Sequence, residues 1–69
     1  MTTLQLVNAK IQYLEEEISE LTYSCKLTNL LNFHTENSHL MSRRLMFIEF
    51  KNWLKEDLLR SLENGEKDV

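Results

Sequence analysis

The chain has 69 residues, 42% of them hydrophobic and 28% charged, and its formal net charge is -3. A chain this short forms one small domain at most, residues 1–69, which buries only roughly 60% of the surface that the unfolded chain would expose. The single cysteine, Cys25, excludes an internal disulfide, so oligomerisation is the remaining route to stability. The acidic balance argues against a protein that mainly binds nucleic-acid phosphates.

Cysteine content and apolar runs indicate a compartment. A single thiol is typical of a reducing environment, and the N-terminus has no basic start followed by an apolar stretch, as a secretory signal would. The longest wholly apolar run, residues 45–48, is much too short to span a membrane. We therefore expect a soluble protein that is cytoplasmic or otherwise intracellular.

The first predicted element is a helix over residues 3–33 that carries an unbroken heptad. Its mostly apolar residues alternate at spacings of three and four, which keeps one narrow seam facing a partner helix. The seam consists of a positions Leu4, Ile11, Ile18 and Cys25 and of d positions Val7, Leu14, Leu21 and Thr28. We predict that this seam is an oligomer interface.

The residue types in the seam favour one arrangement of the helices. Isoleucine at a with leucine at d in the two central heptads favours a parallel, two-stranded coiled coil. In a parallel pair, Lys10 at g would also face Glu15 at e of the other strand. A parallel homodimer is the preferred interpretation, and the alternative is that the seam packs against the second helix of the same chain.

The second predicted element is a turn over residues 34–38. This stretch is poor in strong helix formers and rich in side chains that compete for backbone hydrogen bonds. Asn37 or Ser38 would cap the helix that follows. The alternative is one continuous helix with a weak middle.

The third predicted element is a helix over residues 39–64, which Gly65 would cap before a tail over residues 65–69. The helix is apolar around much of its circumference, and such a helix usually packs against more than one neighbour. The predicted fold class is therefore all-α: a two-helix hairpin that self-associates as a dimeric coiled coil or a four-helix bundle.

Met46, Phe50 and Trp53 are candidates for binding a different protein, because methionine and aromatic residues are enriched at interface cores. The more ordinary interpretation is core packing inside the oligomer. Insertion into a membrane surface is disfavoured by the neighbouring residues Glu49 and Glu56.

Arg44, Lys51 and Lys55 recur at spacings of seven and four and so share one helix face. They could contact an acidic partner or, less readily, nucleic acid. A solvated stripe or salt bridges between helices is the commoner meaning of such a row.

The sequence offers no catalytic residue, cofactor site or metal site. Cys25, His34 and His39 could ligate zinc in principle, but their spacing matches no closed site and a fourth ligand is missing. One glycine cannot form a phosphate-binding loop. We expect a non-enzymatic protein that mediates oligomerisation and protein–protein interaction as an assembly or adaptor subunit. The alternative is a small regulator or inhibitor whose dimeric hairpin docks on another protein or, less readily, RNA.

Overall fold

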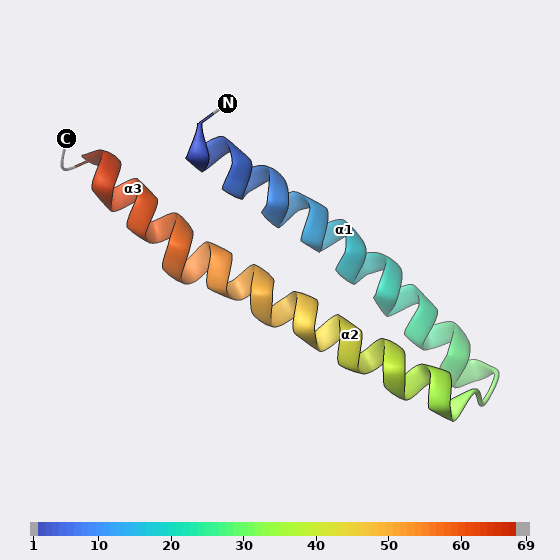
Figure 1. Cartoon of the computed structure of the whole chain (residues 1–69). Helices are drawn as coiled ribbons and strands as arrows, with labels where there is room; N and C mark the ends of the chain where they lie inside the picture. The colour runs from blue at the N-terminus through green and yellow to red at the C-terminus, as the bar shows by residue number, and fades with distance from the viewer. Residues whose placement is uncertain (1, 68–69) are drawn as a thin grey trace.

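The computed structural model describes residues 2–67 and is an antiparallel helical hairpin. The elements in chain order are α1 (Thr3–Leu30), α2 (His34–Trp53), the π-helical segment η1 (Leu54–Leu59) and α3 (Arg60–Lys67). The segments α2, η1 and α3 form one continuous rod that returns along α1, so α3 lies beside the start of α1 (Figure 1). The molecule measures 54 × 18 × 11 Å. This confirms the prediction of an all-α, two-helix hairpin.

The first helix begins with a capping box. The backbone N–H of Gln5 donates to Thr2 Oγ1 at 3.1 Å, and the backbone N–H of Thr2 donates to Gln5 Oε1 at 2.9 Å. Each side chain therefore satisfies a backbone donor that the first helical turn leaves without an intrahelical acceptor. The helix starts at Thr3, as predicted.

The turn lies earlier than predicted, at Leu31, Asn32 and Phe33, and residues 34–38 belong to α2. Asn32 has a φ of 60°, and its N–H donates to Asn29 O at 3.2 Å. The N–H of Phe33 donates to Thr28 O at 2.9 Å. This pair of hydrogen bonds is a Schellman motif, which ends a helix at a left-handed residue, and asparagine adopts that conformation more readily than most residues.

The second rod also departs from the expected helix over residues 39–64. Neither predicted cap is used: α2 starts at His34 after Phe33, which provides no side-chain cap. Gly65 lies inside α3 without a positive φ, so it does not end the helix. The π-helical segment η1 was not predicted. It accommodates an extra residue, so that Leu58 and Leu59, although adjacent in sequence, both pack against the core.

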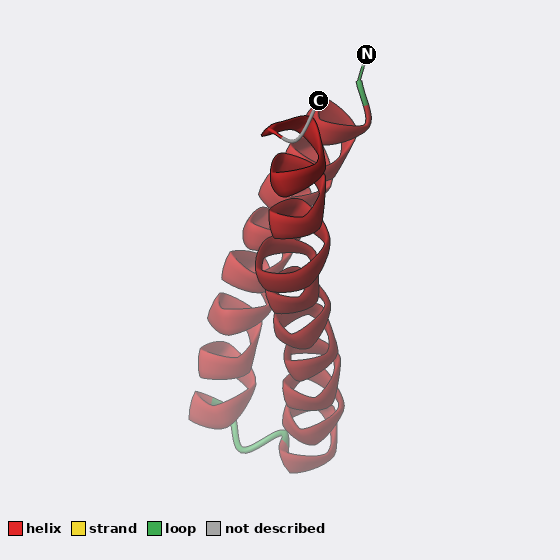
Figure 2. Ribbon diagram, turned by 90° about the vertical axis from the view of Figure 1, so that its left-hand side faces the viewer, coloured by secondary structure: helices red, strands yellow, loops and turns green. Residues whose placement is uncertain are grey.

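The apolar core lies at the end of the hairpin away from the turn. Val7, Ile11 and Leu14 of α1 and Leu54 of η1 are buried there. Four partly buried residues pack around them: Phe47, Leu58, Leu59 and Leu62. The two rods lie against each other along their length, with the short loop at one end (Figure 2). None of the helices in residues 2–67 has the length and apolarity that a membrane-spanning helix requires.

Candidate functional site

The structure places the heptad seam against the other helix of the same chain. Val7, Ile11, Leu14 and Leu21 are buried, and the remaining four seam positions, Leu4, Ile18, Cys25 and Thr28, are half-buried. Their partners lie in the returning rod, where Leu54 completes the buried cluster. The single chain therefore adopts the alternative arrangement of the seam, in which the hairpin itself covers the apolar stripe.

The part of the seam nearer the turn is polar. Asn37 Nδ2 donates to Cys25 O at 2.8 Å and to Thr28 Oγ1 at 3.0 Å, which links α2 to α1. Further along, Arg44 Nε donates to Thr22 Oγ1 at 2.7 Å, and the same hydroxyl donates to Ile18 O at 2.8 Å. These bonds fix how far α2 is shifted along α1, because each requires one particular pair of residues to meet.

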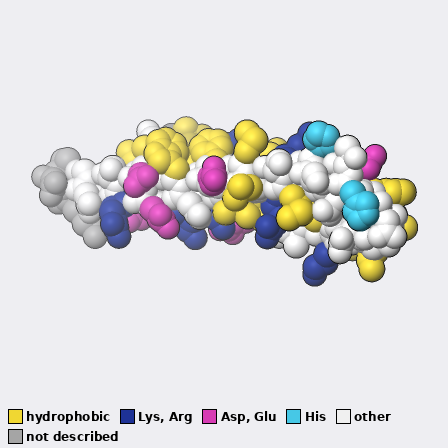
Figure 3. Space-filling view, turned by 90° about the horizontal axis from the view of Figure 1, so that it is seen from below, with side chains coloured by type: hydrophobic (Ala, Val, Ile, Leu, Met, Phe, Trp, Pro, Cys, Tyr) yellow, Lys and Arg dark blue, Asp and Glu magenta, His cyan; other side chains and the backbone are white. Residues whose placement is uncertain are grey.

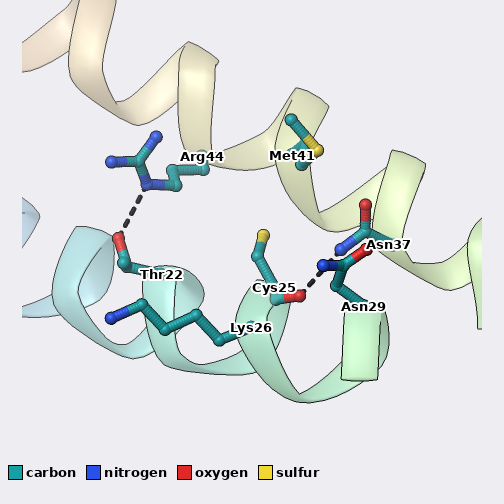
Figure 4. Close-up of a pocket in the computed structure, with 7 residues that line it drawn as sticks. All are labelled: Thr22, Cys25, Lys26, Asn29, Asn37, Met41 and Arg44. Atoms are coloured by element: carbon teal, nitrogen blue, oxygen red, sulfur yellow. Dashed lines mark hydrogen bonds between the residues drawn. The ribbon is translucent and has the colours of Figure 1, made fainter. Parts of the chain in front are cut away.

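A shallow cavity of about 410 Å³ lies beside these polar contacts. Its lining comes from both helices (Figure 4): Thr22, Cys25, Lys26, Asn29, Asn37, Met41 and Arg44. The hydrogen bonds of Arg44 and Asn37 cross this cavity from α2 to α1, so these two side chains already bind groups of the other helix. The arrangement serves helix pairing, and it contains no nucleophile paired with a base.

The three basic residues predicted to share one helix face lie on the side of the returning rod that is nearer α1: Arg44, Lys51 and Lys55. Arg44 is half-buried and bonded to Thr22, and Lys55 Nζ lies 3.9 Å from Glu15 Oε1 with both side chains about half exposed. Lys51 is also half-buried. An exposed ion pair of this kind contributes roughly 0–1 kcal/mol. The structure therefore pairs Lys55 with a carboxylate of the other helix, and Arg44 with a hydroxyl of that helix.

Met46, Phe50 and Trp53 lie on the surface. Met46 is 70% exposed, and the rings of Phe50 and Trp53 are 6.1 Å apart at an angle of 39°. Neither ring is covered, since Phe50 and Trp53 each remain more than two-fifths exposed. Within one chain, these residues are not core residues, and the interpretation as core packing requires a second molecule.

The two long sides of the hairpin differ in character. We call one the polar flank, where Glu15 meets Lys55 and Thr22 meets Arg44. On the opposite side, a groove of about 430 Å³ is lined by Leu27 of α1 and by His39 of α2, among others. Residues seven apart continue the same face of a helix. Leu6 and Tyr13 therefore share the face of Leu27, in a row that Glu20 interrupts between Tyr13 and Leu27. Met46 and Trp53 share the face of His39.

We call this second side the apolar flank. It consists of six residues: Leu6, Tyr13 and Leu27 from α1 and Met46, Phe50 and Trp53 from α2. Seen from the side of the returning rod, hydrophobic side chains gather along one long edge and at the turn, and charged side chains gather mainly along the other edge (Figure 3). Lys10 Nζ lies 4.8 Å from the centre of the Tyr13 ring, a cation–π contact.

Sequence reasoning found only half of this flank. It singled out the residues of α2 but not Leu6 and Tyr13, which share a heptad position with Leu27 on α1. That spacing was visible in the sequence, but the apolar a and d positions of the seam formed a more regular pattern on the same helix. The bridging role of Asn37 was also missed, because it depends on a residue twelve positions away.

The residues considered for metal binding are separated. Cys25 lines the cavity on the polar flank, whereas His39 lines the groove on the apolar flank. Among the side chains that the structure describes, residues 2–65, no group of three or more His, Cys, Asp or Glu could hold a metal ion. The arrangement therefore brings together no ligand set and no Cys–His pair among these candidates.

Comparison with known proteins identifies no relative. No family model matches the chain. No curated protein and no solved structure shows significant similarity to it.

Proposed function

We propose that the protein acts without catalysing a reaction, by self-association and by contact with other proteins, as an assembly or adaptor subunit of a larger helical complex. One observation carries this proposal: far more large hydrophobic side chains are exposed than buried. Among the described residues, twelve large hydrophobic side chains are exposed, whereas five hydrophobic residues are buried.

This imbalance supports association because a monomeric protein rarely exposes a contiguous apolar patch larger than a few hundred Å². A domain this small also gains little from its own core. The exposed residues are not scattered evenly, since they include the apolar flank and a second group near the turn: Leu30, Leu31 and Phe33. Covering such surface with another protein removes it from water at roughly 25 cal/mol for each Å².

The mass in solution tests the proposal. The monomer mass is 8.3 kDa, and we expect multi-angle light scattering to give at least twice that value, with a concentration-dependent approach to the monomer on dilution. A mass equal to one chain at every concentration up to the millimolar range would contradict self-association.

Titration with single- and double-stranded RNA separates this function from nucleic-acid binding. Apolar helix docking responds little to salt, whereas binding to phosphates weakens steeply as salt rises. We expect no RNA binding at low salt. Tight binding that falls steeply with added salt would favour the regulatory, RNA-binding alternative.

A further inference from the structure

We propose that the apolar flank is the docking surface for a second copy of the chain, so that two hairpins pack face to face into a four-helix dimer. The inference rests on the proposed self-association and adds the surface on which it occurs. It also moves the interface away from the heptad seam, where the sequence alone predicts it.

The heptad seam cannot bind a second chain while it packs against the returning rod of its own hairpin. Its central residues, Ile11 and Leu14, already contact the returning rod and are at most 7% exposed. A second chain could reach them only by displacing α2 and η1. The surface left for a partner is therefore one that the hairpin leaves uncovered.

The apolar flank is large enough for a dimer. Its six side chains are each between 43% and 70% exposed, and a large side chain of this kind has roughly 150–250 Å² of surface in total. Together they present on the order of 600 Å² of mostly apolar surface, close to the ~800 Å² that each partner of a standard interface buries. The charged rim would supply the remainder.

The composition of the flank also fits an interface. Aromatic residues and methionine are enriched at interface cores, and tryptophan and tyrosine often carry a large share of the binding energy. Here Tyr13 comes from α1, while Phe50 and Trp53 come from the returning rod. Because both helices contribute, a partner can pack along the groove between them, as helices do in a four-helix bundle.

The charges along the flank favour a second copy as the occupant. Lys10 and Glu17 border it on α1, and Glu20 lies in the same row as Tyr13. Arg43, seven residues before Phe50, borders it on α2. In a twofold dimer the same patch faces itself, so it must hold charges of both signs to be self-complementary. A flank of one sign would instead favour a partner of opposite charge.

Within residues 2–65, the polar flank does not have exposed apolar residues on both helices. Its heptad e positions on α1 are all polar: Asn8, Glu15, Thr22 and Asn29. Only α2 presents exposed apolar residues on that side, including Met41 and Leu45. A partner there would bury the polar row of α1 against apolar side chains, which costs free energy unless each group is hydrogen-bonded.

Two neighbouring residues provide a matched test. Met46 and Leu45 lie in the same helix and are 70% and 55% exposed. Met46 belongs to the apolar flank, whereas Leu45 follows Met41, which lines the cavity on the polar flank, by four residues. Met46→Glu and Leu45→Glu therefore make a similar chemical change at adjacent positions that point about 100° apart on one helix, one toward each flank.

The dissociation constant of the dimer is measured by sedimentation equilibrium for the wild type and both variants, with circular dichroism to verify helicity. We expect Met46→Glu to raise it by roughly 10- to 100-fold, a cost of about 1.4 to 2.8 kcal/mol, and Leu45→Glu to change it less than about threefold. Tyr13→Glu, on the other helix, should act like Met46→Glu. Tyr13→Glu provides a second test of the apolar flank if the Met46→Glu variant does not fold.

The other results overturn the inference in distinguishable ways. If the wild type dimerises and Leu45→Glu is the variant that dissociates it, the docking surface is the polar flank and self-association stands. If Met46→Glu and Tyr13→Glu both remain folded dimers, the apolar flank is not the interface. A wild type that is monomeric at every concentration removes both the inference and the proposed function.

Discussion

The half of the hairpin that holds α3 and the start of α1 is joined mainly by apolar contacts. The half that holds the turn is joined mainly by hydrogen bonds, with Leu21 as a buried apolar residue. In the first half, Leu14 and Leu54 are almost fully buried. In the second half, Asn37 and Arg44 reach across to α1. Fully burying an aliphatic side chain stabilises a fold by roughly 1.5–3 kcal/mol, and a typical hydrogen bond by roughly 0.5–1.5 kcal/mol.

This difference indicates a division of tasks between the two halves. Apolar side chains contribute most of the stability but tolerate sliding, because one leucine packs much like another. Polar contacts contribute less energy but require specific partners, so they determine the alignment of the two helices. Substitutions in each half should therefore differ in size and in kind.

The largest effect is expected from Leu14→Asp. Leu14 is 1% exposed at the centre of the apolar half, and a carboxylate there would have no partner. We expect circular dichroism to show loss of most of the helical signal. Ile18→Asp should destabilise less, because Ile18 is only half-buried. Gln12→Asp, at an exposed position of the same helix, is the control, and a fully helical Leu14→Asp variant would exclude this packing.

A smaller but measurable loss is expected from Leu54→Ala. Removing a buried leucine side chain leaves a cavity and typically costs about 2–5 kcal/mol. Leu54 is the buried member of η1. The free energy of unfolding should fall by this amount in urea titrations at one fixed protein concentration. Asn52→Ala, exposed in the same rod, should change it by less than about 0.5 kcal/mol.

In the polar half, Asn37→Ala should cost about 1–2 kcal/mol, since it removes one donor and leaves Cys25 O without its partner from α2. Ser38→Ala, at the next and exposed position, is the control. We expect the loss to be smaller than for Leu54→Ala in the same urea titrations. The reverse order would show that the polar half provides most of the stability.

The smallest effect concerns the turn that closes the polar half. Asn32 is left-handed, with a φ of 60°, a conformation that costs most residues roughly 1–2 kcal/mol. Asn32→Ala should lower the free energy of unfolding by about 1 kcal/mol, whereas Asn32→Gly should leave it nearly unchanged. Equal stability of the two variants in thermal unfolding would contradict the left-handed turn.

The apolar half is the part of the fold that could be predicted from the sequence. Heptad spacing identified Val7, Ile11 and Leu14 as one contact face, because a helix places residues three and four apart on one side. The pattern could not say which helix covers that face, since a helix of the same chain and a helix of another chain satisfy the same seam. Intrachain closure depends on the turn.

The turn itself was misplaced by comparing average helix propensities. Propensity makes residues 34–38 the weakest stretch, but the helix ends where backbone bonds around Asn32 satisfy its last carbonyl groups. One residue that tolerates a left-handed conformation outweighed several weak helix formers. The cross-helix bonds of Asn37 and Arg44 depend on residues 9 to 22 positions away, so no local pattern could indicate them.

The π-helical turn in the returning rod has a consequence for changes in chain length. A π turn holds one residue more than regular α-helix, so deletion of a single residue within Leu54–Leu59 would leave an ordinary α-helix. Leu62 beyond it would keep its orientation toward α1. The same deletion in α2 would rotate every later side chain by about 100°. Of the two places, η1 is where this chain can become one residue shorter without realigning its two rods.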